Sequence, residues 1–258
     1  MTSQTNRSGQ KWYVHPVTSE RAWSVTTILK AMPKDALTYW AAREAATYAV
    51  DNLDVLAPLA AKGDAGREEA IELTKKAPWR SSGKKRDLGS EIHAAIESLV
   101  LDKPLPAPSP EAEPYLDQFL AFVDTWEPQF LASEAVVWNR TQKYAGTLDA
   151  VCKFVDGTIL VDFKTNDGQG KSEPPYPDVA QQLAAYRHAE FMLLADGTEH
   201  PMPDVDGGAC LAIFPDRYKL VPIECGPEIF NAFLYTREMY RWVYETSKTV
   251  LGQPKIRS

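Results

Sequence analysis

The chain of 258 residues contains only three cysteines, and they lie far apart in the sequence, at Cys152, Cys210 and Cys225. An odd number of widely spaced cysteines does not provide the disulfide framework on which small secreted proteins depend. We therefore expect a reduced, intracellular protein that is stabilised by a hydrophobic core.

Long apolar runs are missing as well. No window approaches the ~18 consecutive apolar residues of a membrane-spanning helix, and residues 1–7 lack the apolar stretch of a secretory signal. The sequence also has no glycine-rich phosphate loop of the Walker type, so we expect no ATP as a cofactor and no fused ATP-driven motor. These absences predict a cytoplasmic protein with no membrane partner.

Positive charge is scarce overall, because 28 Lys and Arg residues face 35 Asp and Glu residues and the net charge is −7. Such a balance argues against a nucleic-acid partner. The positive charges are nevertheless concentrated in residues 75–86, where no acidic residue occurs. The basic residues of this run are Lys75, Lys76, Arg80, Lys84, Lys85 and Arg86. A charge run is usually a solvated surface, but in an acidic chain this one is also suited to phosphate contacts.

Hydrophobic periodicity predicts a mixed α/β (α+β) fold, in which helices flank a central run of strands. Helices are expected at 35–50, 63–76, 87–101, 111–130, 178–195 and 227–250. Strands are expected at 12–14, 22–25, 133–138, 144–155, 158–165, 209–214 and 218–223. The segment 78–83 should separate the expected helices at 63–76 and 87–101. Four prolines should impose an extended connection after the second of these: Pro104, Pro106, Pro108 and Pro110.

The strand pair at 144–165 is the most informative segment. Asp156-Gly157 is a strong signal for a two-residue hairpin turn, which would place Asp149 directly opposite Lys164 and diagonal to Asp162. One face of the pair would then be apolar and packed on the core, with the two carboxylates and the lysine on the other face. Two close carboxylates repel each other unless a proton or cation lies between them, and Mg²⁺ or Mn²⁺ would fit oxygen ligands. The plain alternative is a salt-bridge ladder on a solvated sheet face.

Two helical patterns add to this hairpin. His93 lies at the edge of the apolar stripe formed by Ile92 and Ile96, and Gln182 and Tyr186 share one face of the helix at 178–195. Taken singly, each pattern is commonplace. A lone histidine in such a place is more often a partly buried structural residue.

Four short motifs follow one another in a definite order. They are Gly89-x-x-x-His93, Gly146-Thr-Leu-Asp149, Asp162-Phe-Lys164-Thr165 and Gln182-Leu-Ala-Ala-Tyr186. Together they resemble the RecB-like nuclease family of the PD-(D/E)XK superfamily, over about residues 87–190. The segment Ser24-Val-Thr-Thr-Ile-Leu29, followed by a helix containing Trp40, is similar to bacteriophage-encoded exonucleases of this family.

The resemblance implies a restriction-endonuclease-like core with an N-terminal helical extension, and metal-dependent hydrolysis of DNA phosphodiesters. The positions that correspond to the family's metal ligands are His93, Asp149, Asp162 and the backbone carbonyl of Phe163. Lys164 would orient or deprotonate the attacking water, so that Asp149, Asp162 and Lys164 form the catalytic set. Gln182 and Tyr186 would position the DNA backbone or support the metal ligands. The iron–sulfur cluster of some relatives is not expected, since three cysteines cannot supply four thiolates.

Residues near these motifs are open to two interpretations. Arg80, Lys84, Lys85 and Arg86 are expected to meet DNA phosphates. Trp79 either stacks on an unpaired base or packs on a neighbouring helix. Glu134 could reach the metal, and Glu97 could orient His93, but an exposed strand-end carboxylate and a solvent-facing helix residue are the commoner outcomes.

We therefore expect a metal-dependent DNA exonuclease of recombination or repair, with Mg²⁺ or Mn²⁺ as cofactor. A strand-annealing recombination protein would be a possible partner, and the host cytoplasm the location if a bacteriophage encodes the chain. A site-specific endonuclease on the same fold and a DNA-binding protein with a decayed nuclease site are the alternatives. In this interpretation residues 1–86 guide DNA, residues 87–258 form the nuclease core, and the two parts pack into one compact unit.

Overall fold

The computed structural model describes residues 3–6, 9–105, 107–168, 175–194 and 196–254, except for the side chain of Ser81. The predicted class is confirmed, because helices flank a mixed sheet of ten described strands. The chain divides into two compact units. One comprises Pro33–Glu91, and the other comprises Met1–Met32 together with Ile92–Ser258.

The helices and strands have the following bounds. The α-helices are α1 (Val25–Ile28), α2 (Asp35–Asp51), α3 (Leu53–Ala60), α4 (Asp64–Lys75), α5 (Ala77–Val100), α6 (Glu113–Trp126), α7 (Asp178–Arg187) and α8 (Pro227–Tyr244), with short 3-10 turns at Leu29–Ala31 and Thr246–Lys248. The strands are β1 (Ser3–Thr5), β2 (Lys11–Val14), β3 (Arg21–Ser24), β4 (Gln129–Asn139), β5 (Tyr144–Phe154), β6 (Gly157–Thr165), β7 (Phe191–Leu193), β8 (Glu199–Pro201), β9 (Gly207–Ile213) and β10 (Tyr218–Ile223).

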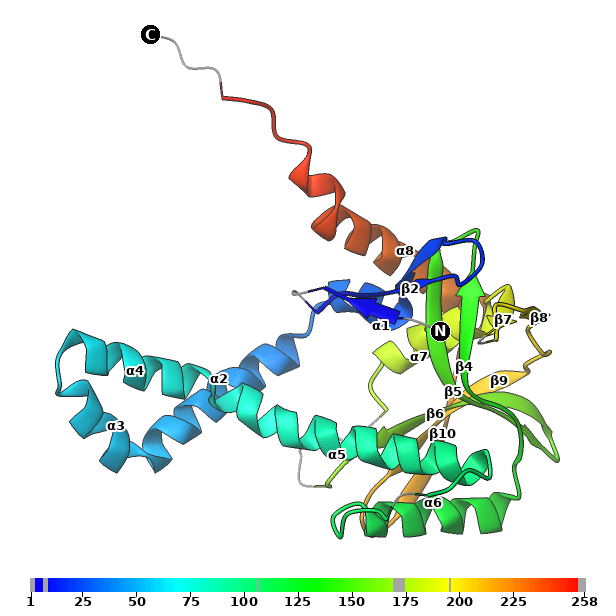
Figure 1. Cartoon of the computed structure of the whole chain (residues 1–258), viewed down its shortest axis with the longest axis horizontal. Helices are drawn as coiled ribbons and strands as arrows, with labels where there is room; N and C mark the ends of the chain where they lie inside the picture. The colour runs from blue at the N-terminus through cyan, green and yellow to red at the C-terminus, as the bar shows by residue number, and fades with distance from the viewer. Residues whose placement is uncertain (1–2, 7–8, 106, 169–174, 195, 255–258) are drawn as a thin grey trace. The chain divides into compact units, whose positions relative to one another are not determined.

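The sheet branches at β5 (Figure 1). One path runs β1-β2-β3-β5-β4-β7-β8, and a second path leaves β5 through β6 to β9 and β10. The beginning of β5 pairs in parallel with β3, at Trp23↔Tyr144 and Ser24↔Ala145. The first 32 residues therefore extend the core sheet, whereas the sequence placed them with an N-terminal DNA-guiding part. A parallel pairing across 120 residues leaves no local signal in the sequence.

The register of the β5–β6 hairpin differs from the predicted one by two residues. The ladder runs from Ala150↔Val161 to Phe154↔Gly157, so Val155 and Asp156 form the two-residue loop. Continued by one residue, this register sets Asp149 next to Asp162 instead of Lys164. Gly157 takes the first paired position with φ 145°, which only glycine adopts readily.

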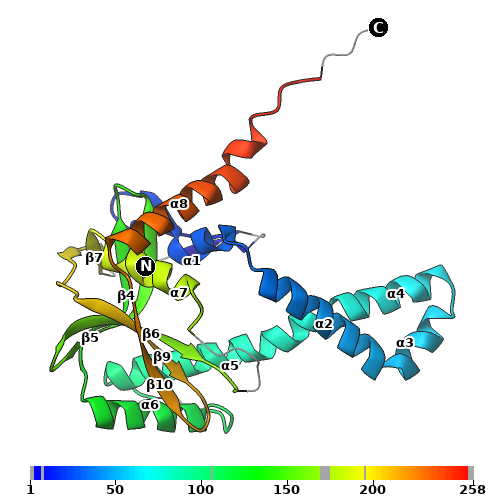
Figure 2. The same cartoon turned by 180° about the vertical axis from the view of Figure 1, so that it is seen from behind.

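Helices cover both faces of the sheet around β6 and β9, with α7 and α6 on opposite sides (Figure 2). On the α7 side, Val151 and Leu160 are buried in one cluster with Leu183. The face of the hairpin expected to be polar is therefore also part of the core. On the α6 side, Phe119 packs edge-on against Phe163 at a centroid distance of 5.8 Å.

The helix bounds correct two predictions. The segment 78–83 does not interrupt a helix, because α5 begins at Ala77 and Pro78 occupies its second position, where a missing N–H costs nothing. The helix expected at 178–195 ends at Arg187, and β7 follows. Of the predicted extended connection, Pro106 lies outside the described residues.

Among the described residues, no helix is long and apolar enough to cross a membrane.

The unit Pro33–Glu91 consists of α2, α3, α4 and the first part of α5, with α3 packed on α4 and α2 in contact with both. None of the residues of α2 is buried. This unit carries the basic run, which is described with the other predicted residues below.

Candidate metal centre

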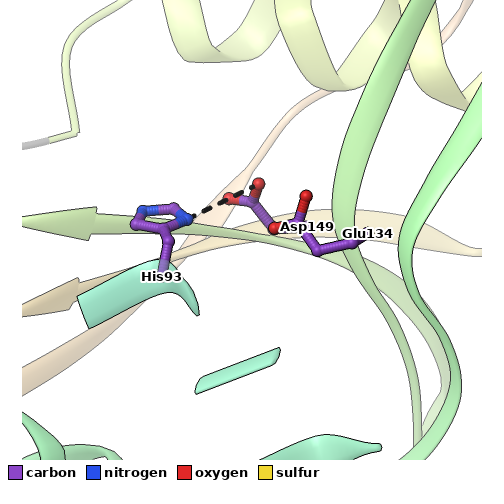
Figure 3. Close-up of side chains that lie close together, drawn as sticks. All are labelled: His93, Glu134 and Asp149. Atoms are coloured by element: carbon purple, nitrogen blue, oxygen red, sulfur yellow. Dashed lines mark ion pairs between the residues drawn. The ribbon is translucent and has the colours of Figure 1, made fainter. Parts of the chain in front are cut away.

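Three side chains from three elements converge in the larger unit: His93 from α5, Glu134 from β4 and Asp149 from β5. Figure 3 shows them pointing toward one another. One ligand atom from each lies within 4.8 Å of the others, and all three residues are half-buried. An imidazole and two carboxylates at this spacing form a donor set that suits a divalent cation.

The fork in the sheet fixes Asp149. Its pairing with β6 ends at Ala150, so the Phe163 N–H has no partner on β5 and donates to Asp149 Oδ2 at 2.7 Å. The other oxygen, Oδ1, lies 4.0 Å from His93 Nδ1. One oxygen of Asp149 thus anchors the side chain, and the other faces His93.

Glu134 is held in an unusual backbone conformation. Its φ is 48°, in the left-handed region, although its neighbours Ser133 and Ala135 pair regularly with Ala150 and Leu148. Burial raises the pKa of Glu134 to about 7, with further increases from the charges of Asp149 and Glu97. A strained residue with a perturbed carboxyl group in this place indicates a functional role. The expected exposed strand-end carboxylate is therefore wrong for Glu134.

Asp162 lies beside this cluster and is only 2 % exposed. Gln182 Nε2 donates to its Oδ1 at 2.7 Å, and Lys164 Nζ lies 2.5 Å from its Oδ2 as an ion pair. Burial raises the pKa of Asp162 to about 6, against the opposing effect of Lys164. Burial would lower the pKa of Lys164, but the charges of Asp162 and Asp149 outweigh it and raise that pKa.

The donor set fits a metal ion for two reasons. Glu134 and Asp149 repel each other at this spacing, and a cation between them removes the repulsion. In addition, the carboxylate of Asp162 is buried beside them, where its Oδ2 is ion-paired with Lys164 at 2.5 Å, so it adds a further negative charge that a cation would stabilise. A solvated salt-bridge ladder, the plain alternative, does not bury a carboxylate in this way.

The other predicted site residues, Phe163, Gln182 and Tyr186, differ in how they contact the site. The peptide N–H of Phe163 reaches Asp149, while its carbonyl oxygen lies 3.4 Å from Lys164 Nζ. Gln182 contacts the carboxylate of Asp162, as expected for a residue that supports the site. Tyr186 is only 3 % exposed, which does not suit a direct contact with DNA, while a role in supporting the metal ligands stays a prediction.

The predicted DNA-binding residues on α5 belong to the smaller unit, and all four are exposed. Arg80 is engaged within that unit, since its Nη2 donates to the Leu73 carbonyl at 2.7 Å and its guanidinium lies over the Tyr48 ring. Trp79 is 75 % exposed and therefore does not pack on a neighbouring helix. The remaining predicted residues of this set are Lys84, Lys85 and Arg86.

Glu97, which is paired with Lys103, also influences the charge of the candidate metal centre. Glu97 accepts a hydrogen bond from Lys103 Nζ at 2.9 Å, and its charge acts on Glu134. Sequence reasoning considered Glu97 only as a partner of His93. Its effect on Glu134, a residue 37 positions further along the chain, depends on the tertiary fold, which no local pattern encodes.

Comparisons with known proteins add little to this geometry. No family model matches the chain, and no curated protein matches it. Among solved structures, the crystal structure of SSO0001 is similar over 68 % of this chain and 69 % of its own, with a TM-score of 0.37 and 14 % identity. A similarity at that level supports no argument about fold or function.

Proposed function

We propose that the chain is a metal-dependent deoxyribonuclease, and that it acts as an exonuclease in recombination or repair. The observation that supports this most is the convergence of His93, Glu134 and Asp149 beside the buried Asp162–Lys164 pair. Metal-dependent phosphodiester hydrolysis requires a cation held by oxygen and nitrogen ligands, with a positive group next to it.

Each residue has a task in this reaction. His93, Glu134 and Asp149 hold Mg²⁺ or Mn²⁺, and Asp162 completes or orients that set. When bound, the cation polarises the phosphodiester and makes a water more acidic. Lys164 presents its ammonium group beside Asp162, where it orients the attacking water and stabilises the developing negative charge. Gln182 keeps Asp162 in place.

The test compares linear and covalently closed duplex DNA in Mg²⁺, Mn²⁺ or EDTA. We expect degradation of the linear form only, and a loss of at least about 100-fold in EDTA and in Asp149→Ala, Lys164→Ala and Glu134→Gln. Asp156→Ala is the matched control, because Asp156 is an exposed acidic residue in the loop of the same hairpin.

Other outcomes assign other functions. Cutting of closed circles would favour the endonuclease, and binding of DNA without hydrolysis in every metal would favour a protein with a decayed site. Mn²⁺ binding measured by calorimetry on the wild type and on Asp149→Ala separates a failure of the metal site from a failure of the chemistry. A cytoplasmic location and a strand-annealing partner remain parts of this proposal, and co-purification with such a protein tests the second.

A further inference from the structure

Lys11 brings a positive charge to the metal centre that the reaction above leaves without a task. It is the first residue of β2, and its Nζ lies 5.0 Å from the centroid of the Tyr13 ring. The hydroxyl oxygens of Tyr13 and Thr147 are 2.8 Å apart. Thr147 lies two residues before Asp149 on β5. A short series of contacts therefore joins Lys11 to the strand that supplies a metal ligand.

The ammonium group of Lys11 has no acidic partner in the described part of the chain. By contrast, Lys75 pairs with Glu72, Lys103 with Glu97 and Lys164 with Asp162. Lys11 is half-buried, and the aromatic ring beneath it holds its charge in place without neutralising it. That charge reaches the site, because it lowers the pKa of Glu134 against the effect of burial.

The charge balance of the site shows why such a group is useful. Glu134, Asp149, Asp162 and Glu97 lie close enough for their charges to act on one another. Lys164 is paired with Asp162, and Lys103 is paired with Glu97. These two pairs leave the charges of Glu134 and Asp149, which one divalent cation balances, so the site with its ion offers no net positive charge to an approaching polyanion. The ammonium of Lys11, whose charge acts on Glu134 and which has no carboxylate partner among the described residues, would supply that attraction.

We propose that Lys11, positioned by Tyr13, forms a phosphate-binding subsite for the DNA strand, occupied by a backbone phosphate adjacent to the one that is hydrolysed. This inference rests on the proposed function and assigns part of the substrate path to β2. It makes Lys11 a substrate-binding residue, with no part in proton transfer or metal binding.

The test measures steady-state kinetics on linear duplex DNA, and equilibrium binding of a short linear duplex in EDTA at several salt concentrations. For Lys11→Gln we expect a KM about three- to tenfold higher, a kcat within about twofold of wild type, and a slope of log K against log salt that is smaller by about 0.9. Lys11→Arg should restore KM. Lys153→Gln, which removes an exposed lysine from the other end of β5, should change nothing.

Several results would overturn the subsite: an unchanged salt slope in Lys11→Gln, a lower kcat at constant KM, or an equal loss in Lys153→Gln. Lys11→Met, which keeps the aliphatic stem, repeats the measurement if Lys11→Gln melts below wild type. If wild type binds DNA but hydrolyses none, the proposed function fails while the salt slope still tests Lys11. If wild type binds no DNA, both fail.

Discussion

Among the single residues of the candidate site, Glu134 combines two unfavourable features: a left-handed backbone conformation and a half-buried carboxyl group. A non-glycine residue at φ 48° within a strand costs about 1 kcal/mol or more, and its carboxyl group is then buried beside Asp149 and Glu97. Both costs are repaid only if something neutralises the charge of Glu134. Under the proposed function, the residue would therefore destabilise the metal-free protein and serve as a ligand in the metal-bound one.

The first prediction concerns Glu134→Gln without metal. The pKa of Glu134 rises from 4.5 to about 7 in the folded protein, so the folded state binds the proton more tightly than the unfolded state does. The free energy of unfolding therefore falls as the pH rises from about 4.5 to 7, and the loss is complete above 7. At pH 8 in EDTA, Glu134→Gln should be more stable than wild type by about 1 to 3 kcal/mol, and the difference should vanish near pH 4.

Urea unfolding at the two pH values measures this effect, and Asp156→Asn serves as the control for removal of an exposed charge. Addition of Mn²⁺ should reverse the order, because wild type gains stability from the ion and the variant largely lacks the ligand. A variant that is less stable than wild type at pH 8 in EDTA would show that the Glu134 carboxylate is already compensated in the metal-free protein.

The identity of most residues in the candidate site could be predicted from the sequence. Asp149, Asp162, Lys164, His93 and Gln182 do lie together, and motif order was enough to gather them. Glu134 was considered as a ligand but judged more often an exposed strand-end carboxylate, because nothing in Ala132-Ser-Glu-Ala135 reveals a left-handed φ inside a strand.

At the scale of elements, the contact between β5 and α7 depends on a glycine. A Cβ on Gly146 would lie 2.4 Å from Tyr186 Cε1, so the ring of Tyr186 occupies the space that any other residue would need. Gly146 and Tyr186 thus pack directly against each other, although the sequence motif predicted a DNA or metal-supporting role for Tyr186. This contact sets the distance of α7, and hence of Gln182, from Asp162 on β6.

The second prediction follows from this contact. Gly146→Ala should lower the free energy of unfolding by about 1 to 3 kcal/mol, because the ring must move in a close-packed core. Gly83→Ala is the matched control: no atom lies within 4 Å of its added Cβ, and alanine favours α5. Combining Gly146→Ala with Tyr186→Leu should restore part of the loss, while Tyr186→Phe should restore none. Additive losses in the Leu combination would contradict the packing explanation.

Elements also show where pattern reasoning reaches its limit. Alternation and turn residues located β4, β5, β6, β9 and β10 to within a few residues. The turn itself was placed one residue too late, which shifts the pairing by two residues, since Asp156-Gly157 is a good hairpin signal but Gly157 is used as the first residue of β6. An error of two residues keeps every side chain on its face, which is why the carboxylates still met.

At the scale of the whole molecule, charge is divided between the two compact units. The larger unit holds the acidic candidate metal centre, and the smaller unit holds the basic run on α4 and α5. Within that run, Lys75 and Lys76 both pair with Glu72, and Arg80 donates to a backbone carbonyl of its own unit. The net charge of the chain therefore says little about how either unit meets a polyanion.

The third prediction separates the two parts of the basic run. Neutralising Lys84, Lys85 and Arg86 together should weaken binding of linear duplex DNA and reduce the salt slope by up to about 2.7, if all three meet phosphates. Neutralising Lys75 and Lys76, whose charges are already partly satisfied by Glu72, should reduce it much less. Both sets are exposed and belong to the smaller unit, and since Arg86 also lies 3.9 Å from Asp87 Oδ1, the change in slope is compared per charge removed.

If the smaller unit contributes to DNA binding and the larger unit carries out hydrolysis, the variants should affect the two activities differently. The triple variant should keep its affinity for Mn²⁺, since it leaves His93, Glu134 and Asp149 unchanged, and should lose activity only where DNA is below saturation. Salt slopes unchanged from wild type in both variants would assign the whole run to the solvated surface. A loss of Mn²⁺ binding in the triple variant would mean instead that the basic segment of α5 acts through His93, on the same helix, and not through DNA.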